Sequence, residues 1–199
     1  MRDAGLPGAR LADVVLDGFA RALDGFEAVV AGVPAGGWDA PSPCEGWCAA
    51  DVAGHVIARL RAVEALAAGR PGDGTAADLR SAAGADPLAA WCTARADMMA
   101  VLEPAALGRP VPLPWGGVMP LGEFLERYPV EILVHTWDLA QATGQAAVLD
   151  PGLVRDALPT ARQFAPAGRA AGLVGPEYAV GEDAGDLARL LAVFGRSAG

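Results

Sequence analysis

The stretch from Leu121 to Thr143 reads LGEFLERYPVEILVHTWDLAQAT and is predicted to form one long helix. Gly144 follows directly and is a favourable residue for ending it. Glu131 and His135 lie four residues apart, so both side chains leave the same face of this helix. Pro129 lacks a backbone N–H and is expected to kink the helix just before Glu131.

The only other histidine in the chain is His55, in the segment DVAGHVIARL. This segment belongs to a helix predicted over about residues 48–68, on which His55 shares an apolar face with Val52 and carries Arg59 one turn further on. A histidine on such a face is expected to point inward, toward the neighbouring helices. Both histidines and Glu131 could therefore converge between two packed helices.

This convergence has two interpretations. Glu and His offer oxygen and nitrogen ligands that zinc, nickel and iron accept, and three protein ligands with an open position are typical of a catalytic metal. Alternatively, the residues form a structural polar cluster, because E-x3-H pairs are common and inward histidines are usually only hydrogen-bonded. The inward position of both histidines favours the metal, as do the apolar neighbours of Glu131, beside which an unpaired carboxylate would be costly.

Length and composition exclude several classes of protein. The 199 residues suit one domain with a sizeable core, and the net charge of −9, without any lysine, disfavours nucleic-acid binding. No apolar run is long enough to span a membrane, and the N-terminus does not resemble a signal peptide, so a cytoplasmic location is expected. Three cysteines without a repeated spacing favour reduced thiols over disulfides or a zinc knuckle.

Further helices are predicted over about residues 11–30, from Asp86-Pro87 onward, from Asp150-Pro151 onward and over about 184–195. The connections 69–85 and 103–120 are rich in Gly or Pro, and the second could be a short hairpin or an extended lid. The sequence does not say whether either closes over a site. The predicted fold is all-α: a single four-helix-bundle domain over 1–199, with a core of about 8–145 and a small helical extension over about 146–199.

Three segments of the chain are informative when taken together: PSPCEGWCAADVAGHVIARL, PVEILVHTWDLAQATG and the terminal DLARLLAVFGR. Together they resemble the DinB-like superfamily and, within it, the mycothiol-dependent maleylpyruvate isomerase-like group. The resemblance implies a four-helix bundle with a divalent metal near one end, and it carries the family's ligands over to His55, Glu131 and His135. The full isomerase has a further C-terminal α/β domain, whereas only about 55 residues follow Gly144 here.

The resemblance implies a metal-dependent enzyme with a small-molecule substrate and a low-molecular-weight thiol such as mycothiol as cosubstrate. Zinc is the expected metal, with nickel or iron as alternatives. A metal-held thiolate would add to an electrophilic substrate, which leads to S-transfer or isomerisation. Two other functions stay open: a hydrolase with a metal-bound water, and a non-enzymatic bundle that binds small molecules in a stress response. A homodimer is compatible with all three.

Two carboxylates lie one helical turn from the predicted histidine ligands. Asp51 precedes His55 by four residues and Asp138 follows His135 by three, so each could orient the ring nitrogen that does not bind the metal. The alternative is that both carboxylates solvate helix ends or pair with arginines.

Two arginines occupy inward stripes of the predicted helices. Arg59 and Arg95 could each bind a substrate carboxylate by bidentate contact. Alternatively, their side chains extend to the rim of the bundle. Cys44, in the loop that precedes the helix of His55, is expected to serve loop packing rather than chemistry.

Overall fold

The computed structural model describes residues 7–72, 78–112 and 117–197, excluding the side chains of residues 7–11. Its α-helices are α1 (Pro7–Ala31), α2 (Ala49–Ala67), α3 (Leu79–Ala83), α4 (Pro87–Val101), α5 (Leu121–Arg127), α6 (Pro129–Ala142), α7 (Pro151–Ala170) and α8 (Asp186–Val193). Two 3-10 helices, η1 (Gly37–Asp39) and η2 (Pro104–Ala106), and two strands, β1 (Pro110–Pro112) and β2 (Val118–Pro120), lie between them.

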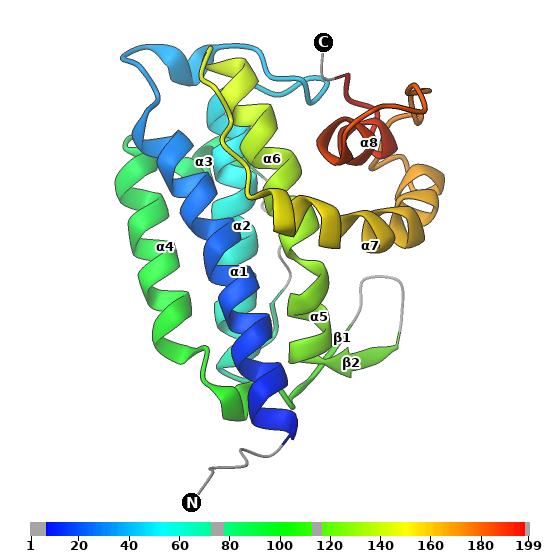
Figure 1. Cartoon of the computed structure of the whole chain (residues 1–199). Coiled ribbons are helices and arrows are strands. Elements are labelled where there is room, and N and C mark those ends of the chain that lie inside the picture. Colours follow the sequence, from blue (N-terminus) through cyan, green and yellow to red (C-terminus); the bar gives the residue numbers. More distant parts are fainter. Residues whose placement is uncertain (1–6, 73–77, 113–116, 198–199) are drawn as a thin grey trace, which may run out of the picture.

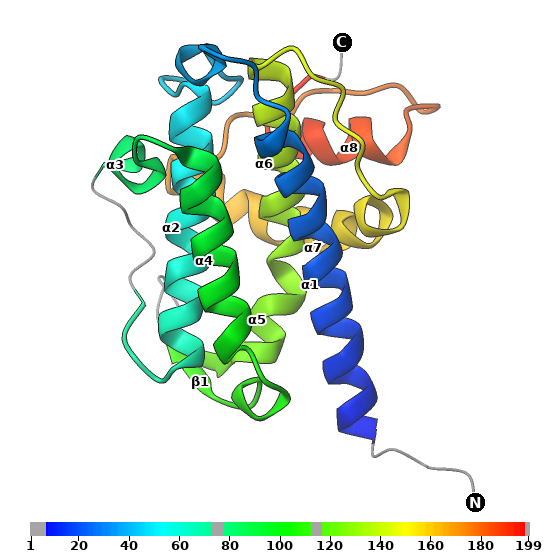
Figure 2. The ribbon, with the colours of Figure 1, turned by 90° about the vertical axis from the view of Figure 1, so that its left-hand side faces the viewer.

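The bundle consists of α1, α2, α4 and a fourth helical segment in which α5 and α6 follow each other end to end (Figures 1 and 2). α2 packs against α4 and α6, and α1 packs against α5 and α6. Apolar stripes on these helices bury the core between them, which includes the fully buried side chains of Phe19, Leu23, Phe26, Ile57, Leu60, Trp91, Met98, Leu125, Ile132 and Leu139. The predicted all-α bundle is confirmed.

The Asp-Pro pairs start helices where the sequence predicts them. The side chain of Asp86 accepts a hydrogen bond from the Ala89 N–H at the start of α4. Asp150 accepts hydrogen bonds from the backbone of Gly152 and Leu153 at the start of α7. In both helices the next residue is a proline, whose missing N–H has no intrahelical role at the first position.

The long helix predicted over 121–143 is two helices rather than one kinked helix. Pro129 has no N–H to donate, and the preceding Tyr128 N–H bonds the Leu125 carbonyl in a tight turn that ends α5. Pro129 then becomes the first residue of α6, so Glu131 lies in the first turn of that helix. A carboxylate there interacts favourably with the helix dipole.

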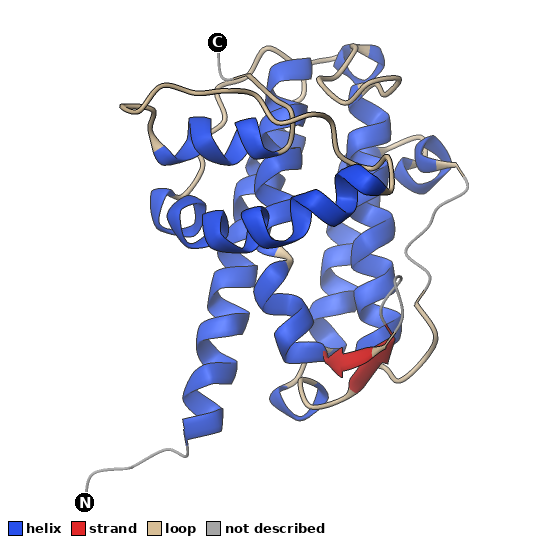
Figure 3. Ribbon diagram, turned by 90° about the vertical axis from the view of Figure 1, so that its right-hand side faces the viewer, coloured by secondary structure: helices blue, strands red, loops and turns tan. Residues whose placement is uncertain are grey.

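The C-terminal extension consists of α7 and α8, which pack against each other on one side of the bundle, with α7 against α6 (Figure 3). In the connection 103–120, β1 and β2 pair antiparallel with Val111 opposite Met119, so it contains a hairpin. Residues 113–116 are outside the described residues. The connection 69–85 contains α3. Within the part of the chain that the structure describes, no helix is long and apolar enough to cross a membrane.

Candidate metal centre

Three predicted ligands meet between α2 and α6. His55 lies in the second turn of α2, Glu131 in the first turn of α6, and His135 one turn further along α6. The Nε2 atom of His55 is 2.8 Å from Oε1 of Glu131, and the two imidazole centroids are 4.8 Å apart. One ligand atom from each residue lies within 4.8 Å of those of the other two. The structure therefore brings together all three residues.

The protonation states in this cluster suit a cation. Burial lowers the pKa of His55, which favours the neutral imidazole that a metal requires. Burial alone would raise the pKa of Glu131, but its hydrogen bond with His55 and the charge of Arg59 outweigh this effect and hold the pKa well below its usual value. The cluster thus offers two imidazoles and one carboxylate, a donor set that zinc accepts.

Arg59 contacts the carboxylate of Glu131, which His55 also contacts. Its Nε is 3.1 Å from Oε1 and its Nη2 is 3.3 Å from Oε2. The guanidinium also lies over the ring of Tyr128, 6.0 Å from the centroid. The predicted inward position of Arg59 is therefore present, but two of its nitrogens face a protein carboxylate.

The second carboxylate predicted near a histidine, Asp138, holds the Nδ1 side of His135. Its Oδ2 atom is 3.1 Å from Nδ1 of His135 and accepts a hydrogen bond from it when that nitrogen carries the proton. Asp138 is fully buried. Burial alone would raise its pKa, but the hydrogen bonds with His135 and Arg196 lower it to about 2.

Two residues that the sequence did not indicate for chemistry complete this environment. Arg196, in the segment after α8, donates from Nη2 and Nε to the two oxygens of Asp138, at 2.8 and 3.1 Å. The thiol of Cys44 contacts the same carboxylate at 3.2 Å and also contacts Arg196. Arg196 lies in the quoted terminal segment DLARLLAVFGR, which was the available signal, but no helical spacing relates it to His135.

Trp47 covers both histidines. Its ring centroid lies 5.1 Å from that of His55 and 6.0 Å from that of His135, nearly parallel to the latter. Two backbone contacts stabilise the loop that carries Trp47, just before α2. Pro41 and Cys48 form a β-bridge, and the Ser42 N–H donates a hydrogen bond to the Trp47 carbonyl. The indole thus walls one side of the cluster.

Two predicted site residues lie elsewhere. Asp51 accepts hydrogen bonds from the N–H and thiol of Cys48 at the start of α2, so it caps the helix instead of orienting His55. Arg95 on α4 pairs with Asp24 and Glu27 on α1. It faces the carboxylates of the adjacent helix because the inward stripe of α4 meets α1 at this level.

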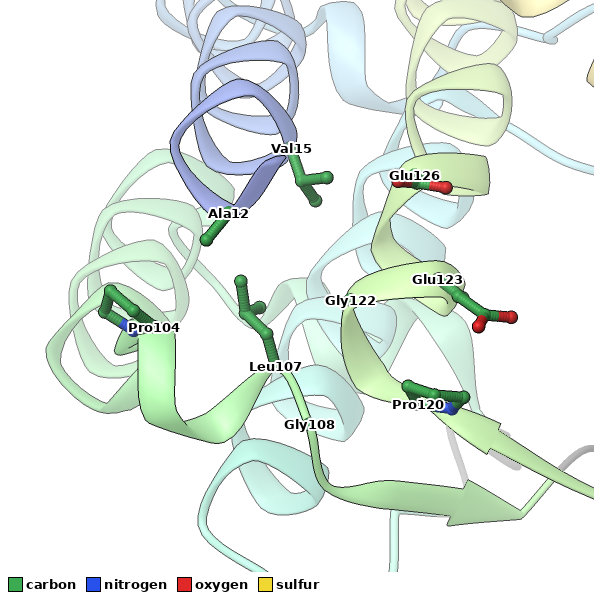
Figure 4. A pocket seen from close by; sticks show the side chains of 9 residues that line it. All are labelled: Ala12, Val15, Pro104, Leu107, Gly108, Pro120, Gly122, Glu123 and Glu126. Atoms are coloured by element: carbon green, nitrogen blue, oxygen red, sulfur yellow. The ribbon is translucent and has the colours of Figure 1, made fainter. Parts of the chain in front are cut away.

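Other places could hold a ligand, and each is less suitable. Cys44, His135 and Asp138 form a second group of metal-binding residue types, but the guanidinium of Arg196 contacts two of them. A pocket of about 320 Å³ lies at the hairpin end of the bundle, between α1, η2 and α5 (Figure 4). Its walls are mostly apolar, and its two carboxylates, Glu123 and Glu126, are exposed.

Comparison with known proteins finds relatives that are similar in sequence. Two uncharacterized proteins of Mycobacterium tuberculosis, from strains H37Rv and CDC 1551, are each 33% identical to the chain over 164 residues, covering 79% of it and 78% of each relative.

Two solved structures share the fold at 18% sequence identity. The crystal structure of the mycothiol-dependent maleylpyruvate isomerase matches with a TM-score of 0.57, over 86% of this chain and 74% of the other. A histidine-to-alanine mutant of the same enzyme matches with a TM-score of 0.56, over 80% and 70%. The family model described as the mycothiol maleylpyruvate isomerase N-terminal domain matches residues 19–140. This range covers more than half of the chain and includes the three converging residues. The chain therefore belongs to the mycothiol maleylpyruvate isomerase N-terminal domain family.

Proposed function

We propose that the protein is a divalent-metal-dependent enzyme that uses a low-molecular-weight thiol, such as mycothiol, to transfer sulfur to a small electrophile or to isomerise it. The observation that carries this proposal is the convergence of His55, Glu131 and His135, with ligand atoms within 4.8 Å of one another. The name of the structural relatives, a mycothiol-dependent isomerase, supports the choice of thiol.

The donor set fits zinc first, and nickel or iron as alternatives, because imidazole and carboxylate are borderline to hard ligands. When bound, such a metal stabilises a thiol as thiolate, which makes a nucleophile available at neutral pH. The half-buried position of the histidines and the cover of Trp47 exclude part of the surrounding water. In this proposal Asp138 keeps the Nδ1 proton of His135 in place and thereby leaves Nε2 as the ligand atom.

Arg59 remains the candidate for contact with a substrate. Two of its nitrogens face Glu131, and Nη1 takes no part in that pair. A substrate with a carboxylate near its electrophilic carbon would meet this nitrogen beside the metal ligands. Arg95 is withdrawn from this role because Asp24 and Glu27 engage it.

The first test is elemental analysis of protein purified without added metal. The wild type is compared with His135→Ala and Glu131→Gln, and with Glu126→Gln, which changes an exposed carboxylate on α5. About one equivalent of metal in the wild type and in Glu126→Gln, lost in the other two variants, would support the centre. No metal in any sample, even after reconstitution, would mean that the three residues form a structural polar cluster.

The second test separates the reactions. Metal-loaded protein is incubated with an electrophile, such as maleylpyruvate, with and without mycothiol. Turnover that requires both metal and thiol is expected. Turnover without thiol would instead indicate a metal-dependent hydrolase. No turnover with any electrophile would favour a non-enzymatic bundle that binds small molecules.

A further inference from the structure

The position of Arg196 is fixed by the way α8 ends. Gly195 has φ +74°, a left-handed conformation that reverses the chain, and its N–H bonds the Ala192 carbonyl. The Arg196 N–H bonds the Leu191 carbonyl at 2.9 Å. This pair of hydrogen bonds is the Schellman arrangement, which closes a helix and directs the next side chain back along it. The side chain of Arg196, which follows this turn, reaches Asp138 on α6.

The guanidinium meets a buried carboxylate whose other side-chain partners are His135 and Cys44. Asp138 is fully buried, and both of its oxygens accept hydrogen bonds from Arg196. Such paired, charge-assisted contacts are strong and geometrically selective. A third nitrogen of Arg196, Nη1, donates to the Phe194 carbonyl at 2.7 Å, which anchors the side chain to its own turn.

We propose that Arg196 is a positioning residue of the metal centre: from 58 residues further along the chain, it holds Asp138 against Nδ1 of His135 and so keeps Nε2 available as the ligand atom. The inference rests on the proposed function, because it assigns Arg196 a role in the same metal centre. Without Arg196, Asp138 loses two of its hydrogen bonds and keeps the contacts with His135 and Cys44, so it fixes the position and the tautomer of His135 less firmly.

The test uses two ways of disturbing this contact, each with a matched control. Arg196→Gln removes the charge, and Arg169→Gln removes another arginine that ties the end of α8, through the Val193 carbonyl, without touching Asp138. Gly195→Ala keeps Arg196 but displaces its turn, because an added Cβ would lie 2.9 Å from the Pro176 carbonyl oxygen. Gly172→Ala has the same left-handed strain at φ +72°, with no described atom within 4 Å of the added Cβ.

Zinc affinity is measured by competition with a chelator, and urea unfolding checks that each variant is folded. We expect Arg196→Gln and Gly195→Ala to bind zinc at least about ten-fold more weakly than the wild type, the range typical of residues that orient a ligand. Both controls should stay within about two-fold. Unchanged affinity in Arg196→Gln would overturn the inference and leave the metal centre intact.

A second readout needs no metal. The chain has two histidines, so ¹⁵N spectra of the metal-free protein above neutral pH resolve the tautomer of His135. The Nδ1–H form is expected in the wild type, with a mixture of forms in Arg196→Gln. If the wild type binds no zinc, the proposed function fails, and this spectrum alone decides the positioning role: an unchanged Nδ1–H form in Arg196→Gln overturns it.

Discussion

At the scale of single residues, the thiol of Cys44 shows how burial sets reactivity. Removal from water, followed by the charge of Asp138, raises the pKa of Cys44 to about 12, although Arg196 acts in the opposite direction. Only the thiolate reacts with electrophiles, and at pH 8 about one molecule in ten thousand would carry it. We therefore expect iodoacetamide to leave Cys44 unmodified in the folded protein.

Cys92 provides the comparison within the same chain, because it is an exposed thiol on α4. Peptide mass spectrometry after timed alkylation should find Cys92 modified first, and Cys44 modified only after unfolding in urea. Equal rates at the two cysteines in the folded protein would contradict the burial of Cys44 between Asp138 and Arg196.

The convergence of the three candidate ligands and the place of Asp138 beside His135 could be predicted from the sequence, whereas the contacts of Arg196 and Cys44 could not. Glu131 and His135 are linked by one helical turn, and His55 is the one histidine left to join them. Arg196 and Cys44 reach the centre through tertiary contacts that span 58 and 94 residues, which no local spacing encodes. Asp51 was predicted to orient His55, but its carboxylate instead accepts a hydrogen bond from the N–H of Cys48, which lies in the same turn at the start of α2.

At the scale of elements, two helical glycines differ sharply. A Cβ on Gly54 in α2 would lie 1.8 Å from the Leu79 carbonyl oxygen, so this glycine permits the close approach of α3. A Cβ on Gly25 in α1 would meet no described atom within 4 Å. We expect Gly54→Ala to lower the free energy of unfolding by about 1–3 kcal/mol, and Gly25→Ala to raise it by up to about 1 kcal/mol.

Urea denaturation of the two variants beside the wild type measures both effects. Because alanine is favoured over glycine in any helix interior, opposite signs can arise only from the contact with α3. A Gly54→Ala variant as stable as Gly25→Ala would show that α3 does not lie against α2 at this position.

The contact between α1 and α4 gives a dependence of stability on pH. Glu27 accepts hydrogen bonds from Arg95 and from the indole N–H of the buried Trp91, and these bonds lower its pKa despite partial burial. A lowered pKa in the folded state means that the stabilisation is present above the unfolded value of about 4.3 and is lost as the pH falls below it.

Glu27→Gln should therefore be less stable than the wild type at pH 7, by less than about 1 kcal/mol because the ion pair is partly exposed. The difference should shrink as the pH is lowered toward 3, which urea denaturation at several pH values would detect. Glu45→Gln, in an exposed loop, is the control and should follow the wild type throughout. A difference that grows on acidification would contradict the lowered pKa of Glu27.

The helices themselves could largely be predicted, because their N-terminal caps and apolar stripes are patterns of residues close together in the sequence. Asp86 and Asp150 cap helices as expected. The prediction of a kink at Pro129 was wrong in degree: the tight turn at Tyr128 ends α5, and α6 begins at Pro129. The hairpin of β1 and β2 stayed one of two alternatives, because three-residue strands carry too short a pattern to identify.

At the scale of the whole molecule, the candidate metal centre is assembled from distant parts of the chain. The loop before α2 supplies Trp47 and Cys44, α2 and α6 supply the predicted ligands, and the turn after α8 supplies Arg196. Arg196, after the last helix of the C-terminal extension, therefore contacts Asp138, the same buried carboxylate that His135 contacts. This long-range closure is the part of the architecture that the sequence pattern did not reveal.

The apolar core contains none of the three candidate ligands, and this predicts the effect of chelation on metal-loaded protein. The largest fully buried side chains, such as Trp91, Phe19 and Phe26, belong to one apolar core between the helices. Chelation should therefore leave the helical circular dichroism signal at 25 °C unchanged. Zinc at 100 times its dissociation constant should stabilise the fold by about 2.7 kcal/mol, a rise in melting temperature of roughly 5–10 °C for a chain of this size.

His135→Ala is the control for this effect, because it keeps the core and removes one predicted ligand. Zinc should leave its melting temperature unchanged, so the rise seen in the wild type can be assigned to the centre rather than to non-specific binding. Loss of the helical signal after chelation at 25 °C would contradict the prediction. It would mean that metal binding and folding are coupled, as in small zinc domains, and that the buried side chains of the bundle are not sufficient to hold the helices together.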